Sequence, residues 1–138
     1  MRFLGIGDYC DLGALYLRLI EEGHEVKIFI ANPLCKNTLA GLAPQTADWR
    51  DELDWIRAAG NDGIILFENV AHGRGSLQDS LRDDGFRVIG GSAYGDRLEN
   101  DRAFAQSVLA SVGLSTAPVW EFSDRVTALD FLDTHPGR

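Results

Sequence analysis

The chain has 138 residues, of which 45% are hydrophobic and 25% charged, and its formal net charge is −8 at pH 7. This composition is typical of one well-buried globular domain and argues against disorder. The acidic balance disfavours a nucleic-acid partner, which requires a basic surface, and no apolar run has the length of a membrane span. Cys10 and Cys35 have neither metal-ligand nor redox spacing, and the N-terminus has no signal-peptide pattern, so we expect a reducing, cytoplasmic location.

The first thirty residues predict a strand, a helix and a second strand. Residues 3–6 form a short apolar run that is typical of a buried strand, and residues 26–30 form another. Between them we expect a helix with Asp11 as its N-cap and Gly23 as its end. Its apolar face consists of Leu12, Leu15, Tyr16, Leu19 and Ile20. A strand, helix and strand in this order predict an α/β fold, namely a Rossmann-like, doubly wound parallel sheet.

The middle of the chain continues this alternation. Residues 31–48 contain prolines and a glycine, so any strand there should be short. The remaining elements that the pattern predicts are a helix over residues 49–60, a strand over 63–67, a helix with Leu77 and Leu81 that ends at Gly85, and a strand over 86–89.

The last third predicts one long helix and a short tail. Carboxylates crowd the helix start, at Asp96, Glu99 and Asp101, as suits the helix dipole, and Gly113 ends the helix. Its apolar positions are Ala105, Val108, Leu109 and Val112. Beyond a domain boundary at Pro118 we expect a strand over residues 119–122. A helix capped by Ser123 or Asp124 should follow, with an inward face made of Val126, Leu129 and Leu132.

Two glycine-rich turns are candidates for ligand binding. The turn at Gly90, Gly91 and Ser92 lies between a strand and a helix, where backbone N–H groups can meet a phosphate or a carboxylate. The alternative is a tight strand-to-helix connection without a ligand. The first turn begins with Gly5 and Gly7, but it lacks the third glycine of a dinucleotide site, and Asp8 and Asp11 would repel a pyrophosphate.

Residues 90–118, GGSAYGDRLENDRAFAQSVLASVGLSTAP, resemble the segment that joins the N-terminal domain to the next lobe in ATP-grasp ligases. They are most similar to the phosphoribosylamine–glycine ligases, in which a G-P-[ST] turn, S-K-A-F, an amphipathic helix and I-P-T-A follow one another. The resemblance is good from about Asp62 onward. It implies a domain at 1–118 and the beginning of the ATP-grasp lobe at 119–138, and it makes Arg102 a nucleotide-binding residue at the position of the family's lysine.

The resemblance also implies a function and its partners. The whole enzyme would join a carboxylate to an amine with ATP and Mg²⁺, as in purine biosynthesis, and would contact a small-molecule substrate and its own further lobes. We expect no catalytic residue, metal site or cofactor in this part, which should be inactive alone. The expected substrate-binding residues are Gly7, Asp8, Tyr9, Asp11, Glu68, Asn69, His72, Arg74, Gly91 and Ser92.

Departures from the family pattern limit what the resemblance implies. The first loop of these ligases is G-x-G-G-R-E-H-A, and this chain lacks its Arg, Glu and His, so phosphoribosylamine does not follow as substrate. Asp8, Tyr9 and Asp11 suit a cationic or hydroxylated group better. His72 and Arg74 suit a carboxylate or phosphate, although a solvated loop explains them equally well.

Two hypotheses of other classes stay open. One is a nucleotide- or metabolite-binding module that works alone, which predicts a closed, stable surface over residues 119–138. The other is a structural or interaction domain that could form a homodimer. The three tryptophans suggest this hypothesis, and it predicts an exposed apolar patch.

Overall fold

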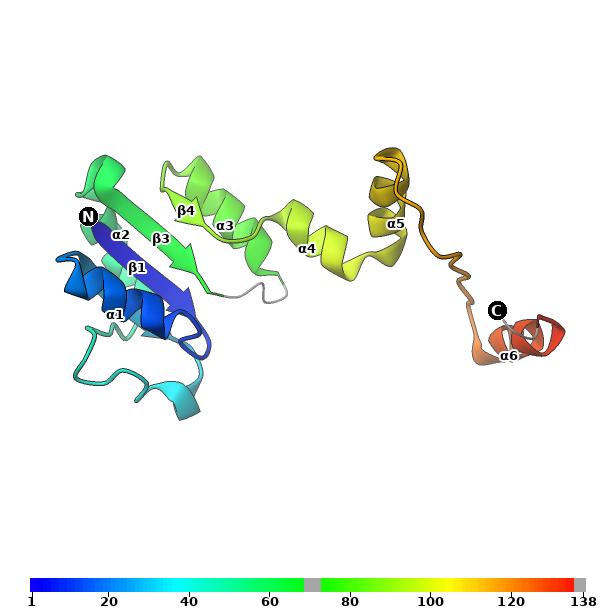
Figure 1. Ribbon diagram of the computed structural model, residues 1–138, viewed down its shortest axis with the longest axis horizontal. Helices are drawn as coiled ribbons and strands as arrows, with labels where there is room; N and C mark the ends of the chain where they lie inside the picture. Colours follow the sequence, from blue (N-terminus) through cyan, green and yellow to red (C-terminus); the bar gives the residue numbers. More distant parts are fainter. Residues whose placement is uncertain (69–72, 136–138) are drawn as a thin grey trace. The chain divides into compact units, whose positions relative to one another are not determined.

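Four parallel strands form the centre of the protein, in the spatial order β2-β1-β3-β4 (Figure 1). The computed structural model describes residues 1–68 and 73–135. The strands are β1 (Arg2–Gly7), β2 (Glu25–Ile30), β3 (Gly63–Phe67) and β4 (Val88–Ile89). Because every pairing is parallel, all four strands end at the same edge of the sheet.

Side chains that alternate along the strands form a core on each face of the sheet. Phe3 belongs to one core, which α1 (Gly13–Glu21) covers with Tyr16. Leu4 belongs to the other, which α2 (Leu53–Arg57) and α3 (Arg74–Asp83) cover with Ile56 and Leu81. Figure 1 shows helices on both sides of the sheet. The prediction of a Rossmann-like, doubly wound α/β fold is confirmed.

Helix α1 begins later than the sequence predicts. Leu12, not Asp11, is the N-cap residue, and it makes no side-chain cap hydrogen bond. The chain stays in a turn over Asp11, whose backbone N–H is held by a carboxylate from the end of β3. The predicted end is confirmed, since Gly23 follows the helix with φ of +83°.

The helix predicted over residues 49–60 is fragmented. A 3-10 helix (Trp49–Glu52) leads into α2, and another 3-10 helix (Gly60–Asp62) leads into β3. Asp48 starts the first of these, because its carboxylate accepts a hydrogen bond of 2.9 Å from the backbone of Arg50. The segment from residue 31 to residue 48 contains a 3-10 helix at Pro33–Cys35. Its only sheet pairing that the structure describes is one parallel bridge, between Gln45 and Ile28 of β2.

The long helix predicted after Ser92 is also divided in two. Helix α4 (Ala93–Asn100) ends at Asp101, which is extended with φ of −110°, and α5 (Arg102–Ser111) follows. Asn and Asp side chains compete with the helix for backbone hydrogen bonds, and Asn100 Nδ2 indeed donates to the carbonyl of Asp96 at 2.7 Å. The expectation of one continuous helix was wrong for this reason.

The chain forms two compact units, residues 1–102 and 103–138. The second contains most of α5 and also α6 (Arg125–Thr134), whose predicted cap is confirmed by a bond of 2.9 Å from the backbone of Thr127 to Asp124. Residues 119–122 form no strand, and the described residues 103–135 contain no other strand with which they could pair. The predicted boundary at Pro118 stays a prediction.

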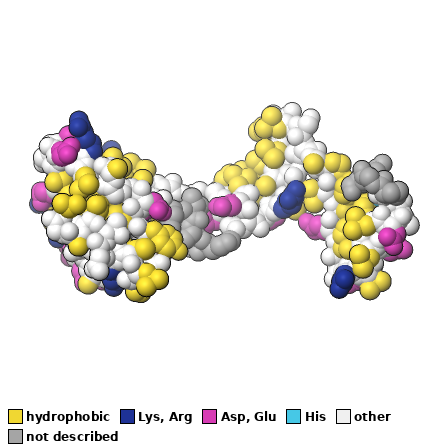
Figure 2. Space-filling view, turned by 60° about the horizontal axis from the view of Figure 1, so that its bottom comes forward, with side chains coloured by type: hydrophobic (Ala, Val, Ile, Leu, Met, Phe, Trp, Pro, Cys, Tyr) yellow, Lys and Arg dark blue, Asp and Glu magenta, His cyan; other side chains and the backbone are white. Residues whose placement is uncertain are grey.

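Apolar side chains of the second unit are largely exposed. None of its described residues, 103–135, is buried. Val126, Leu129 and Leu132 are 76%, 48% and 54% exposed, so their predicted inward orientation was wrong. Figure 2 shows hydrophobic side chains at the surface of this unit. Helix α6 instead packs through Phe131, whose ring lies 5.2 Å from each of the rings of Trp120 and Phe122.

Candidate functional site

The predicted site residues gather at the edge where the strands end. Gly7 is the last residue of β1, Glu68 directly follows β3, and Gly91 and Ser92 follow β4. Ligands of open α/β sheets bind outside this carboxyl edge. The topology therefore brings together residues that are as many as 85 positions apart in the sequence, and side-chain contacts then connect them.

Glu68 connects the end of β3 to the turn after β1. Its Oε2 accepts a hydrogen bond of 2.9 Å from the backbone N–H of Asp11, and its Oε1 accepts one of 2.7 Å from the hydroxyl of Tyr16. Gly7 leaves the space for this carboxylate, since a Cβ at that position would overlap it. The predicted residues Gly7, Asp11 and Glu68 thus form one contact group.

Burial and the Glu68 carboxylate change the acidity of two neighbouring groups. The Tyr16 hydroxyl is fully buried, and burial, its hydrogen bond to Glu68 and the charge of Glu68 all raise its pKa. Cys10, with φ of +68°, lies in the same turn. Burial, followed by the charges of Glu68 and Asp11, raises the pKa of its thiol to about 11. Both groups therefore stay protonated at neutral pH, and Cys10 is a poor nucleophile there.

Arg74 reaches back from the start of α3 to the turn after β1. Its guanidinium donates to Asp8 Oδ1 at 2.6 Å, and both side chains are about one quarter exposed. Gly73 precedes the helix with φ of +76°, a conformation that favours glycine. The residue that was expected to hold a carboxylate or phosphate is therefore engaged with a carboxylate of the protein itself.

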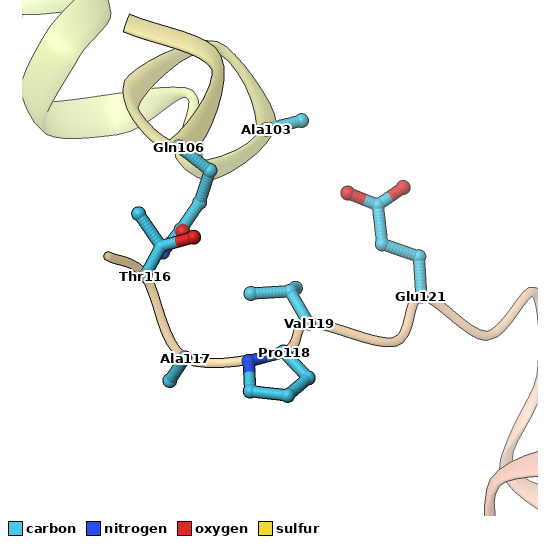
Figure 3. A pocket seen from close by; sticks show the side chains of 7 residues that line it. All are labelled: Ala103, Gln106, Thr116, Ala117, Pro118, Val119 and Glu121. Carbon is cyan, nitrogen blue, oxygen red and sulfur yellow. The ribbon is translucent and has the colours of Figure 1, made fainter. Parts of the chain in front are cut away.

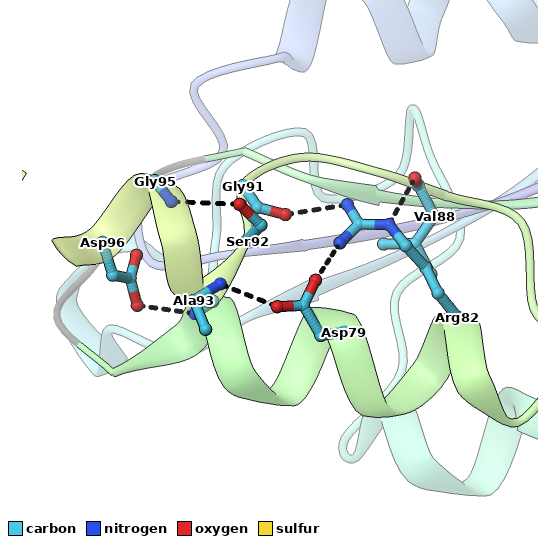
Figure 4. A network of polar contacts seen from close by, with 9 residues as sticks. Asp79, Arg82, Val88, Gly91, Ser92, Ala93, Gly95 and Asp96 are labelled. Atoms are coloured by element: carbon cyan, nitrogen blue, oxygen red, sulfur yellow. Dashed lines mark hydrogen bonds and ion pairs between the residues drawn. The ribbon is translucent and has the colours of Figure 1, made fainter. Parts of the chain in front are cut away.

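The turn at Gly91 and Ser92 is held from below by α3 (Figure 4). Asp79 Oδ2 accepts from the backbone N–H of Ala93 at 2.8 Å, and Asp79 Oδ1 accepts from Arg82 at 2.8 Å. Arg82 in turn donates to the carbonyl oxygens of Gly91, at 2.8 Å, and Val88, at 3.4 Å. This network fixes the path of the backbone from β4 into α4.

The start of α3 packs closely on the same turn. The backbone N–H of Gly75 donates to Asp96 Oδ2 at 2.8 Å, and a Cβ at Gly75 would overlap the Ser92 carbonyl. Ser92 caps α4 through its Oγ, which accepts from the backbone of Gly95 at 3.0 Å. Only glycine at position 75 allows α3 and α4 to approach this closely.

The sequence analysis did not predict four residues as members of this site: Tyr16, Asp79, Arg82 and Asp96. Asp96 belongs to the site because it accepts from the Gly75 N–H. Tyr16 was assigned to the apolar helix face, and Asp96 only to the helix dipole. The Asp79–Arg82 pair has the i,i+3 spacing of an ion pair within a helix, which is a sequence signal. Nothing in that spacing indicates that Asp79 also reaches the backbone fourteen residues away.

The structure does not connect all predicted residues to this group. Tyr9 is 53% exposed, and Arg102 is an exposed residue at the start of α5. Asn69 and His72 lie outside the described residues. Within residues 1–68 and 73–135, no three His, Cys, Asp or Glu side chains come together in a way that would hold a metal ion. No helix of that part of the chain has the length and apolar character of a membrane span.

A hollow of about 500 Å³ lies within the second unit, between the start of α5 and the extended segment that follows it (Figure 3). Its seven lining residues are Ala103, Gln106, Thr116, Ala117, Pro118, Val119 and Glu121. Glu121 is the only charged residue among them, so the lining carries no cation that would attract a phosphate.

Comparison with solved structures finds the same kind of fold in the crystal structure of N5-carboxyaminoimidazole synthetase from Staphylococcus aureus complexed with ADP. The TM-score is 0.59 at 17% sequence identity. The match covers 96% of this chain and 36% of the synthetase chain, so this chain spans about a third of the length of that protein. No protein-family model matches the sequence, and no curated protein matches it. At this identity the likeness establishes the fold.

Proposed function

We propose that this chain is the N-terminal, substrate-side domain of an ATP-dependent carboxylate–amine ligase of the ATP-grasp class. One observation supports it above the others: nearly the whole chain matches about a third of a synthetase that was crystallised with ADP. The parallel sheet and the gathering of the predicted residues at its carboxyl edge agree with such a role.

The substrate would lie at the edge formed by Gly7, Asp8, Asp11 and Glu68, next to Gly91 and Ser92. Tyr9, Asn69, His72 and Arg74 belong to the same proposed surface, and Arg102 is proposed to face the nucleotide. ATP and Mg²⁺ are proposed for the whole enzyme. The described residues provide no cluster of acidic ligands for the metal, so no step of the reaction is assigned to this part of the chain.

The exposure of the second unit supports the proposal that it packs against further lobes of the same protein. Because none of the described residues 103–135 is buried, this unit has no closed core of its own. The alternative, a binding module that works alone, predicts a closed surface over residues 119–138. Val119, Trp120 and Phe122, each about 40% exposed, argue against that alternative.

Calorimetry with MgATP tests the proposal. The 138-residue chain should give no saturable heat, because the nucleotide site is assigned to further lobes. The whole enzyme, as proposed with its further lobes, should bind MgATP and release ADP only when an amine and a carboxylate are both present. Micromolar binding by the 138-residue chain, or a longer protein without ATP-dependent ligation of any amine, would contradict the assignment.

A further inference from the structure

We propose that Glu68, Asp79 and Asp96 act as internal anions that exclude phosphate from the carboxyl edge of the sheet. In folds of this class a helix start after a parallel strand commonly binds phosphate through its backbone N–H groups. In this protein three backbone N–H groups, each at the turn or helix start that follows a different strand, donate to carboxylates of the protein itself.

The first of these places is the turn between β1 and α1. The backbone N–H of Asp11 donates to Glu68 at 2.9 Å, and the space beside Gly7 is filled by the same carboxylate. The hydroxyl of Tyr16 holds the other oxygen of Glu68 at 2.7 Å. A phosphate that binds the Asp11 N–H would have to displace a carboxylate that has two donors.

The second and third places lie where α3 and α4 begin. The Gly75 N–H donates to Asp96, and the Ala93 N–H donates to Asp79, each at 2.8 Å. These bonds are reciprocal between the two helices, since α4 supplies the carboxylate for α3 and α3 supplies the one for α4. Charge-assisted bonds of this kind are among the stronger hydrogen bonds in proteins.

The arginines of this edge are engaged in the same way. Arg74 pairs with Asp8 at 2.6 Å, and Arg82 pairs with Asp79 at 2.8 Å. With Asp11, Glu68 and Asp96 counted as well, the described residues of this edge include five carboxylates and two guanidinium groups. An approaching phosphate would therefore meet net negative charge in addition to occupied donors.

This exclusion narrows the substrate class of the proposed ligase, and to that extent it rests on the proposed function. A ligand at this edge presents a neutral or cationic group to the protein, and any phosphate it carries lies elsewhere. The exclusion itself is a property of the 138-residue chain, whatever reaction the whole protein catalyses.

The test is a titration of the ¹⁵N-labelled 138-residue chain with inorganic phosphate and pyrophosphate, at constant ionic strength set with sodium chloride. The backbone amide signals of Asp11, Gly75 and Ala93 report on the three places. We expect no saturable shift at these amides up to tens of millimolar phosphate. A saturable shift at any of them in the unsubstituted chain would overturn the proposal.

Asp79→Ala should create the missing site, because it frees the Ala93 N–H and the Nη1 of Arg82, whose other nitrogens stay on the carbonyl oxygens of Gly91 and Val88. Its matched control is Asp83→Ala, which removes an exposed carboxylate from the same helix and changes the net charge equally. We expect phosphate to bind Asp79→Ala at least about tenfold more tightly than Asp83→Ala, as the loss of one charge-assisted bond implies. Equal affinities would overturn the proposal.

Asp96→Ala repeats the experiment at the Gly75 amide should Asp79→Ala not fold. It is judged by the same tenfold difference from Asp83→Ala. These titrations use neither ATP nor turnover. An inactive longer protein would therefore refute the proposed ligase function and leave the proposed exclusion of phosphate intact. Phosphate binding by the unsubstituted chain would refute the exclusion and leave the ligase class standing.

Discussion

The hydroxyl of Tyr16 donates a hydrogen bond of 2.7 Å to Glu68 Oε1, which joins the middle of α1 to the end of β3. Tyr16 is fully buried, and Glu68 at the sheet edge is partly exposed. The ring also packs over Gly5, where a Cβ would overlap the hydroxyl end of the tyrosine. One side chain thus both covers the sheet and orients the carboxylate of the candidate site.

Tyr16→Phe should lower the free energy of unfolding by about 1–2 kcal/mol, because a partly buried carboxylate loses one of its two donors. Urea denaturation followed by circular dichroism measures this loss. Tyr9→Phe is the control, since Tyr9 is 53% exposed, and it should change stability by less than about 0.5 kcal/mol. Equal effects of the two substitutions would show that the Glu68 bond contributes little.

Gly63→Ala and Gly95→Ala should change stability in opposite directions. A Cβ at Gly63 would overlap the backbone carbonyl of Ile56, which cannot move away easily, so we expect a loss of about 1–3 kcal/mol. A Cβ at Gly95 would lie 3.5 Å from Ser92 Oγ, an ordinary contact, inside α4. Alanine is the better helix former, so this variant should gain about 0.5–1 kcal/mol. The urea concentration at the midpoint of unfolding, compared with that of the unsubstituted chain at equal m-value, measures the change in stability of each variant.

Cys10 should resist alkylation much longer than Cys35 at pH 8. Cys10 is buried and its thiol pKa is raised to about 11, whereas Cys35 is partly exposed. Mass spectrometry after timed treatment with iodoacetamide gives both rates. Faster modification of Cys10 would mean that the turn after β1 opens readily.

Stability should also fall at alkaline pH because of Cys10. The folded protein holds the thiol proton more tightly than the unfolded chain, whose pKa is near 9.0. The contribution of this group is therefore complete below pH 9 and is lost as the pH rises toward about 11. Tyr16 also has a raised pKa and contributes to the fall in stability over the same range. The contribution of Cys10 is therefore the difference between the urea-unfolding profiles of Cys35→Ala and of the double variant Cys10→Ala, Cys35→Ala between pH 8 and 11. A difference that does not change over that range would contradict the raised pKa.

The layered architecture was predictable because its signals are local. The apolar runs around Phe3, Val26 and Ile65 are short and each has a glycine at or near one end, and the 3.6-residue spacing that includes Tyr16 marks the first helix. Where prediction failed, short polar side chains compete with the backbone. Asp101 divides a helix whose apolar spacing continues past it, and Asp48 starts a 3-10 turn where a regular helix was expected.

The candidate site was predictable as a place but not as a set of contacts. The rule that ligands bind at the carboxyl edge of a parallel sheet selects Gly7, Glu68 and Ser92 from the strand ends alone. The partners of these residues depend on tertiary distances, such as the one across 57 positions from Asp11 to Glu68. No periodicity encodes such a pair, so Asp79, with its bond to Ala93, could be found only in three dimensions.

A chain that ends at Arg102 should fold on its own with nearly the stability of the 138-residue chain. Every buried residue of the described part lies between Phe3 and Phe86, and both core clusters are complete within that range. Neither cluster contains a residue of 103–138, so we expect a change of less than about 1 kcal/mol. Urea unfolding of both chains, followed by the fluorescence of Trp49 and Trp55 with Trp120 replaced by Phe in the longer chain, measures it. A larger loss would mean that residues 103–138 stabilise the sheet domain, which is what a module that works alone requires and what the ligase proposal does not.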